Sequence, residues 1–133
     1  RIGHDLQPLD IVVVNTAAGM ALANSDPAYV SRGAGVGYEG TMYLLERGVR
    51  VTGTDAWSWD APFVHTKDKV AETGDPRLIW EGHRAGHDIG YCNIEKMHTL
   101  EAIPATGFMI SCFPNKIKGA SAGWTRAVAI FEG

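Results

Sequence analysis

The sequence has few cysteines, few basic residues and no long apolar run, and each shortage excludes a class of protein. Its two cysteines, Cys92 and Cys112, cannot build a disulfide framework or a four-cysteine zinc site, so we expect a reducing compartment, the cytoplasm. The 12 basic residues and the net charge of -3 disfavour a nucleic-acid-binding surface. The apolar stretches are far shorter than the roughly 20 residues of a membrane helix. We therefore expect neither a nucleic-acid partner nor a membrane.

What the sequence does contain is the composition of a folded protein. Hydrophobic residues make up 45% of the chain and charged residues 20%, which is typical of a soluble globular protein and not of a disordered one. A length of 133 residues fits one domain over residues 1–133. The 16 glycines disfavour a helical bundle. Catalysis and small-molecule binding are the function classes left open.

The first half of the chain predicts a strand, a helix and a second strand. Residues 10–16 form a β-branched run between turn-forming residues, which indicates a buried strand. Residues 39–47 end with Arg47 and are followed by Gly48, and both are helix-ending signals. Residues 49–55 then alternate apolar and polar positions. This order favours an α/β fold.

The second half of the chain has weaker signals. Residues 56–73 have no sustained period, so we expect an aromatic loop that leads into a short helix. Pro76 can open another helix, from about Arg77 through Trp80 to Arg84. Further short strands are expected over residues 91–95, 108–113 and 125–131.

Metal-ligand side chains concentrate in one part of the chain. His83, His87 and His98 fall within sixteen residues, and Glu81, Asp88, Glu95 and Glu101 lie in or next to this stretch. His83 and His87 have the i, i+4 spacing that would place both on one face of a helix and let them bind a metal. No glutamate follows the first histidine, however, and Gly86 interrupts the helix. An exposed His87 near a helix end is the favoured alternative.

His83 and Glu95 form a second candidate pair, because a helix and a returning strand can bring residues twelve apart to one mouth of a sheet. The two side chains could share a cation, or the imidazole could take a proton from a metal-bound water. The alternative is a surface histidine and a glutamate that pairs with Lys96 or Arg84. A catalytic zinc ion usually takes three protein ligands, so the pair alone would be incomplete.

Other residues allow both functional and structural interpretations. Asp55 ends a strand, where α/β sheets place ligand-binding groups, but it could equally cap a turn. Trp57, Trp59 and Phe63 lie in irregular chain and could stack on a substrate, contact another subunit or be buried beneath the loop. The glycine run at residues 33–37 does not have dinucleotide-binding spacing and disfavours a nucleotide site.

The longest of several distinctive runs is Glu39-Gly-Thr-Met-Tyr-Leu-Leu-Glu-Arg-Gly-Val-Arg-Val-Thr-Gly-Thr-Asp-Ala-Trp-Ser-Trp-Asp-Ala-Pro62. This run makes the sequence similar to the putative cyclase family of metal-dependent hydrolases, the group that contains bacterial kynurenine formamidase and isatin hydrolase. The resemblance covers nearly the whole chain and extends to residues 6–16, 80–83, 93–96 and 117–121.

The resemblance implies a divided metal site. In this family an upstream motif, His-x-Gly-Thr-His-x-Asp-x-Pro-x-x-His, supplies most metal ligands, and a histidine and a glutamate twelve residues apart lie downstream. His83 and Glu95 match the downstream pair, whereas the upstream motif does not occur in this sequence. The resemblance therefore implies that Glu95 is a ligand of a divalent metal, zinc or manganese. It implies that His83 either ligates a metal or hydrogen-bonds the attacking water.

The same resemblance implies the fold, the activity and the partners. The fold would be an α/β domain of the swivelling β/β/α type with a mixed sheet and flanking helices, corresponding to the carboxy-terminal part of a family member. The activity would be hydrolysis of an amide, lactam or ester bond in a small cyclic or aromatic substrate. The resemblance gives the aromatic residues no fixed role, and Trp57, Trp59 and Phe63 are candidate pocket walls from their place in the sequence. The alternative is a non-catalytic structural or binding subunit.

The start of the chain and the missing motif lead to an expectation about partners. The chain begins at Arg1 and not at methionine. We expect an amino-terminal segment or a companion chain to carry the upstream motif, and we expect a homo-oligomer.

Overall fold

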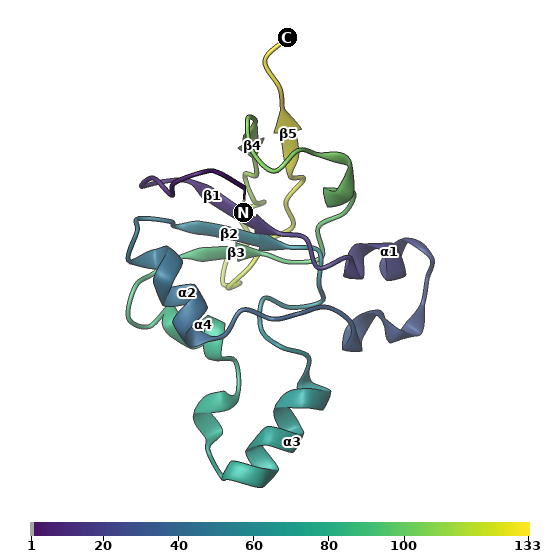
Figure 1. Ribbon diagram of the computed structural model, residues 1–133, viewed down its shortest axis with the longest axis vertical. Coiled ribbons are helices and arrows are strands. Elements are labelled where there is room, and N and C mark those ends of the chain that lie inside the picture. The colour runs from purple at the N-terminus through teal and green to yellow at the C-terminus, as the bar shows by residue number, and fades with distance from the viewer. Residues whose placement is uncertain (1) are drawn as a thin grey trace. The chain divides into compact units, whose positions relative to one another are not determined.

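The computed structural model describes residues 2–133, which divide into two compact units (Figure 1). Residues 5–101 form the larger unit, and residues 102–133 together with residues 2–4 form the smaller one. No helix of the described residues is long and apolar enough to cross a membrane. All of the candidate site residues lie in the larger unit.

The larger unit is built on a parallel sheet of three strands, in the order β1-β2-β3. The register pairs Ile11 with Val51 and Val51 with Cys92. Parallel neighbours need long crossover connections, and these connections carry the helices. The strands are β1 (Ile11–Val14), β2 (Val51–Thr54) and β3 (Cys92–Ile94).

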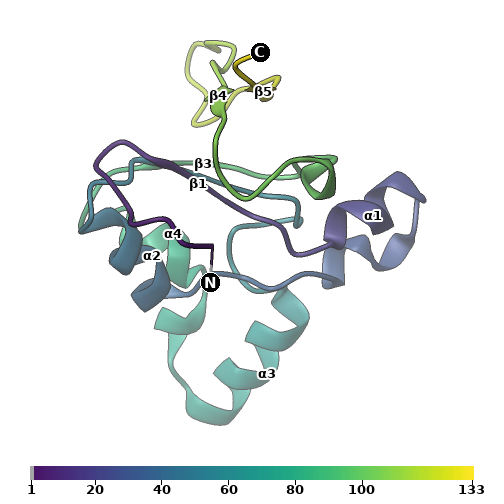
Figure 2. The same ribbon diagram turned by 45° about the horizontal axis from the view of Figure 1, so that its top comes forward.

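The helices of the larger unit are short. Two of them, α2 and α4, pack against each other and lie side by side on one face of the sheet (Figures 1 and 2). The α-helices are α1 (Ala18–Ala23), α2 (Tyr38–Leu45), α3 (Phe63–Thr73) and α4 (Glu81–Ala85), and the 3-10 helices are η1 (Pro27–Ser31) and η2 (Pro76–Leu78). A further 3-10 helix, η3 (Leu100–Ala102), begins at the end of the larger unit and includes the first residue of the next segment.

The core includes buried side chains from the paired helices and from the loop after β2. Leu45 of α2, Ala85 of α4, Val49 and Trp59 are all buried. The indole Nε1–H of Trp59 donates to the buried Thr41 hydroxyl at 3.0 Å, which satisfies its polar atom. This packing fixes the loop that carries the candidate site.

The expected strand, helix and strand of the first half are confirmed, and so is the α/β class. The helix expected over residues 77–84 is wrong, because the chain forms η2 and then the separate α4. Trp80 lies between them in the left-handed conformation, with φ 53° and ψ 50°, which cannot continue a right-handed helix.

The smaller unit contains a two-stranded antiparallel sheet. Its strands are β4 (Met109–Ser111) and β5 (Val128–Ile130), and Ile110 pairs with Ala129. The rings of Phe108 and Phe131 beside it lie 5.7 Å apart. The resemblance implied one mixed sheet, but within residues 2–133 the parallel strands and the antiparallel pair form separate sheets.

Candidate active site

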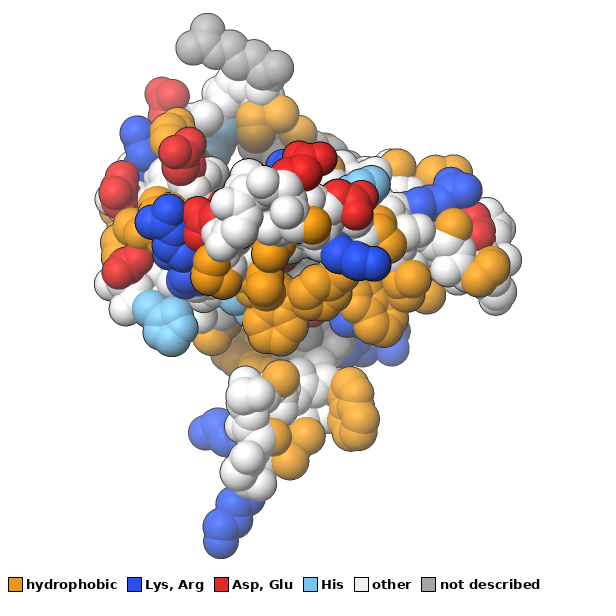
Figure 3. Space-filling model, turned by 90° about the horizontal axis from the view of Figure 1, so that it is seen from below, with side chains coloured by type: hydrophobic (Ala, Val, Ile, Leu, Met, Phe, Trp, Pro, Cys, Tyr) orange, Lys and Arg blue, Asp and Glu red, His pale blue; other side chains and the backbone are white. Residues whose placement is uncertain are grey.

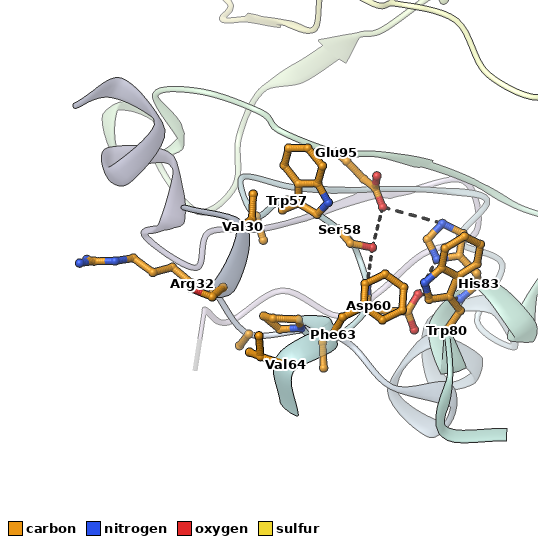
Figure 4. A pocket seen from close by; sticks show the side chains of 16 residues that line it. Val30, Arg32, Trp57, Ser58, Asp60, Phe63, Val64, Trp80, His83 and Glu95 are labelled. Carbon is orange, nitrogen blue, oxygen red and sulfur yellow. Dashed lines mark hydrogen bonds and ion pairs between the residues drawn. The ribbon is translucent and has the colours of Figure 1, made fainter. Parts of the chain in front are cut away.

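A pocket of about 390 Å³ lies where the carboxyl ends of β2 and β3 meet the helices (Figure 4). Ligand-binding groups of α/β proteins commonly lie at this end of parallel strands. Residues 56–58 and 60–62 follow β2 and form one side of the pocket, and Glu95 comes directly after β3. His83 reaches the same pocket from α4.

The imidazole of His83 is held by the buried carboxylate of Asp60. Asp60 is 6% exposed and accepts hydrogen bonds from the backbone N–H groups of Gly82, at 2.5 Å, and His83, at 3.2 Å. It also contacts His83 Nδ1. Because an ionised carboxylate only accepts hydrogen bonds, we assign the proton to Nδ1. His83 Nε2 then carries the free lone pair on the Glu95 side of the ring.

Glu95 lies on the other side of His83 and binds the loop after β2. Its Oε1 accepts hydrogen bonds from Ser58 Oγ at 3.1 Å, Trp59 N–H at 2.9 Å and Asn93 Nδ2 at 3.0 Å. His83 Nε2 is 3.8 Å from the same oxygen, while Lys96 Nζ is 3.6 Å from Oε2. Three donors saturate Oε1, so Oε2 is the oxygen with acceptor capacity left.

The two carboxylates favour the charged form of His83. The hydrogen bond to Asp60 raises the pKa of His83 above 6.5, and the negative charges of Asp60 and Glu95 act in the same direction. Burial opposes them by lowering this pKa, but its effect is smaller than that of the hydrogen bond. His83 therefore holds a proton more readily than a histidine in water.

Aromatic side chains form much of the pocket wall. Trp57 and Phe63 line it, as the sequence suggested. The expectation for Trp59 is corrected: it is 1% exposed, and its hydrogen bond to Thr41 places it in the core and not in the pocket wall. Trp80 lines the pocket and was not singled out as a site residue from the sequence.

Asp60 is the second residue that sequence reasoning missed. Its signal was weak, a carboxylate in the loop that follows β2, and its partner is 23 residues away in the chain. His87 lies beyond the end of α4 and is exposed, so it does not share a helix face with His83. Asp55 is buried and accepts hydrogen bonds from Thr16 and from the N–H of Gly19 in α1, which is a structural role.

The side chains of the pocket do not form a complete metal site by themselves. Among residues 2–133, no group of three His, Cys, Asp or Glu side chains could hold a metal ion. His83 Nδ1 is used by Asp60 and Glu95 Oε1 by three donors. Only His83 Nε2 and Glu95 Oε2 remain as ligand atoms, whereas a catalytic zinc ion usually has three protein ligands.

Comparison with known proteins finds a family that is similar to the first part of the chain. The family model described as "Putative cyclase" matches residues 1–61. The match covers a little less than half of the chain. The resemblance noted from the sequence is thereby confirmed. No curated protein matches the chain.

The fold of the chain is similar to that of part of a larger solved protein. The chain is similar to the crystal structure of an isatin hydrolase bound to the product analogue thioisatinate, with a TM-score of 0.78 and 19% sequence identity. The match covers 97% of this chain and 48% of that one. The chain therefore spans about half the length of the solved structure, and at this identity the likeness shows the fold alone.

Proposed function

We propose that the pocket hydrolyses an amide, lactam or ester bond of a small cyclic or aromatic substrate, with His83 as general base. The observation that carries the proposal is the contact between Asp60 and His83 Nδ1. It fixes the tautomer and leaves Nε2 as the basic nitrogen. The match of residues 1–61 to the putative cyclase family supports the same reaction class.

The proposed reaction needs one proton acceptor that later becomes a donor. His83 Nε2 takes a proton from water while the water oxygen forms a bond to the substrate carbonyl carbon. Asp60 and Glu95 stabilise the resulting imidazolium. The bond from the carbonyl carbon to the leaving nitrogen or oxygen then breaks, and Nε2 returns the proton to the leaving group.

The divalent metal of the family stays a proposal, because His83 and Glu95 provide only two ligand atoms. A bound zinc or manganese ion would polarise the substrate carbonyl. Holding it requires further ligands, and we propose that an amino-terminal segment, a companion chain or a second copy in a homo-oligomer supplies them. The proposed swivelling β/β/α fold would be completed in the same way.

The test compares His83→Ala with His87→Ala on a panel of aryl amides and aryl esters. Each variant is assayed alone and together with a putative-cyclase segment that carries the His-x-Gly-Thr-His motif. His83→Ala should lower kcat/KM by about 10²- to 10⁴-fold, as expected for loss of a general base. His87→Ala is the control, because that side chain is exposed beyond α4. Equal rates for wild type and His83→Ala, with unchanged circular dichroism, would reject the site.

The alternative function is that of a non-catalytic structural or binding subunit. The incomplete donor set at His83 and Glu95 is the observation that favours it. Absence of hydrolysis by the wild-type chain, both alone and with the added segment, would support this alternative.

A further inference from the structure

Trp80 has a backbone conformation that is unusual for a bulky side chain. It precedes α4 with φ 53° and ψ 50°, in the left-handed region of backbone conformation that residues other than glycine rarely adopt. Its carbonyl accepts the N–H of Arg84 at 2.8 Å, which closes the first turn of α4. Such a conformation costs free energy and persists only where the surroundings hold it, often at functional sites.

The conformation places the indole of Trp80 between two other rings. Its ring centroid is 5.4 Å from that of His83, with a tilt of 37°, and 6.0 Å from that of Phe63, with a tilt of 39°. The three rings follow one another along the pocket (Figure 4). The side chain of Trp80 is nevertheless 52% exposed, so much of the indole is not covered by the chain.

Trp57, another aromatic side chain of the pocket, has its own partners within the chain. Lys96 Nζ lies 4.4 Å from the ring centroid of Trp57, and the ring of Tyr29 meets Trp57 edge-on at 6.2 Å. Figure 3 shows apolar side chains gathered beside polar ones on the face where α3 lies. Among the residues that line the pocket, Phe63, Val64 and Trp80 are apolar and exposed. Of the pocket aromatics, Trp80 is the one in ring contact with His83.

We propose that Trp80 is the specificity-determining residue of the pocket and selects ligands that carry a planar ring. The ring stacks on the indole, which brings a carbonyl attached to it close to His83 Nε2. The position of the carbonyl beside Nε2 rests on the proposed role of His83. Selection of a planar ring concerns binding alone and can be measured without hydrolysis. Aromatic stacking strengthens binding by about twofold to tenfold over burial alone.

The test uses two formamides that differ in the ring alone. Formanilide carries a planar ring, and N-cyclohexylformamide carries a saturated ring of the same size. Dissociation constants for the full chain are measured by ligand-observed NMR. Wild type should bind formanilide more tightly, and Trp80→Gly, which keeps the left-handed backbone accessible, should remove that preference. Trp80→Phe should keep part of it.

Matched variants separate stacking from general damage. Trp124→Ala removes an exposed tryptophan of the smaller unit and should leave both constants unchanged. Equal weakening of both ligands by Trp80→Gly would overturn the proposal, because it would mean that the side chain only supports the pocket. A wild type without preference would overturn it as well. Ring-selective binding without hydrolysis, both alone and with the added amino-terminal segment, would refute the general-base role of His83 and uphold ring selection by Trp80.

Discussion

At the scale of single residues, the chemistry of the site depends on one imidazole between two carboxylates. Asp60 accepts a hydrogen bond from the Nδ1–H group of His83, while Glu95 faces Nε2 across 3.8 Å. An imidazole in this position has a defined tautomer and an increased affinity for protons. A histidine with a raised pKa accepts a proton from water more favourably. It can act as a base only where the pH leaves its imidazole unprotonated.

The activity should therefore increase with pH. The pKa of His83 is raised above 6.5, chiefly by the hydrogen bond to Asp60, so the unprotonated base accumulates only above that raised pKa. We expect kcat/KM to rise with pH through this pKa. The same midpoint should appear when the His83 ring is titrated by NMR. In Asp60→Asn the midpoint should move down; a midpoint that does not move would show that Asp60 has no influence on the base.

Stability should change with pH in the opposite direction. Because the pKa of His83 is raised in the folded chain, its contribution to the free energy of unfolding is complete below the unfolded value of 6.5. It is lost as the pH rises through the folded pKa. Urea midpoints measured across this range should fall for wild type and change less for His83→Gln. Parallel curves for the two proteins would contradict the assignment.

At the scale of elements, the site depends on a close approach of two loops. Val36 N–H donates to the carbonyl oxygen of Trp59 at 2.8 Å, which joins the segment before α2 to the loop after β2. A Cβ atom on Gly35 would lie 1.9 Å from the backbone nitrogen of Ala61 and 2.2 Å from the carbonyl carbon of Asp60. Only glycine fits this contact without moving the backbone that carries Asp60.

Replacement of Gly35 should therefore damage both stability and activity. Gly35→Ala is expected to lower the free energy of unfolding by about 1–3 kcal/mol or more, as overpacked cores do, and to displace Asp60 from His83. Gly90→Ala is the matched control, since its Cβ would meet nothing within 4 Å. Urea unfolding and the hydrolysis assay measure the two effects. The two variants should differ, and equal stability would show that the loops separate readily.

Local patterns predicted the elements that form within short stretches of chain. The β-branched run of β1 and the Arg47 and Gly48 ending of α2 are local signals, and both elements form as expected. The break before α4 was missed, because the ring contacts of Trp80 with Phe63 and His83 exist only in the folded chain.

The site was predictable only in part, because only some of its contacts join residues that are close in the sequence. The twelve-residue spacing brought His83 and Glu95 together, whereas the contact between Asp60 and His83 spans a helix and two loops. Trp59 and Trp57 are two positions apart in one loop, yet Trp59 meets Thr41 in the core and Trp57 lines the pocket. Sequence distinguishes such neighbours poorly, because their environments are set by tertiary packing.

At the scale of the whole molecule, the chain should bind zinc weakly when it is alone. His83 Nε2 and Glu95 Oε2 are two ligand atoms, one fewer than a catalytic zinc site usually has. Calorimetric titration with zinc should show weak binding that His83→Ala lowers further. The amino-terminal family segment should increase the affinity by at least an order of magnitude if it supplies the missing ligands. Tight binding by the chain alone would indicate ligands outside this pair.

The two units should also differ in how readily they open. In the larger unit β2 is paired on both sides, by β1 and β3, and Thr52 and Thr54 are buried. In the smaller unit β4 and β5 have one neighbour each, and a sheet of two strands is marginally stable in water. Amide hydrogen exchange followed by mass spectrometry should therefore show slower exchange in β2 than in β4 and β5, by at least about tenfold.

Equal protection would mean that both units open in one cooperative step. Faster exchange in the smaller unit would mean that the His83 pocket persists when β4 and β5 are open, because every residue of that pocket belongs to residues 5–101.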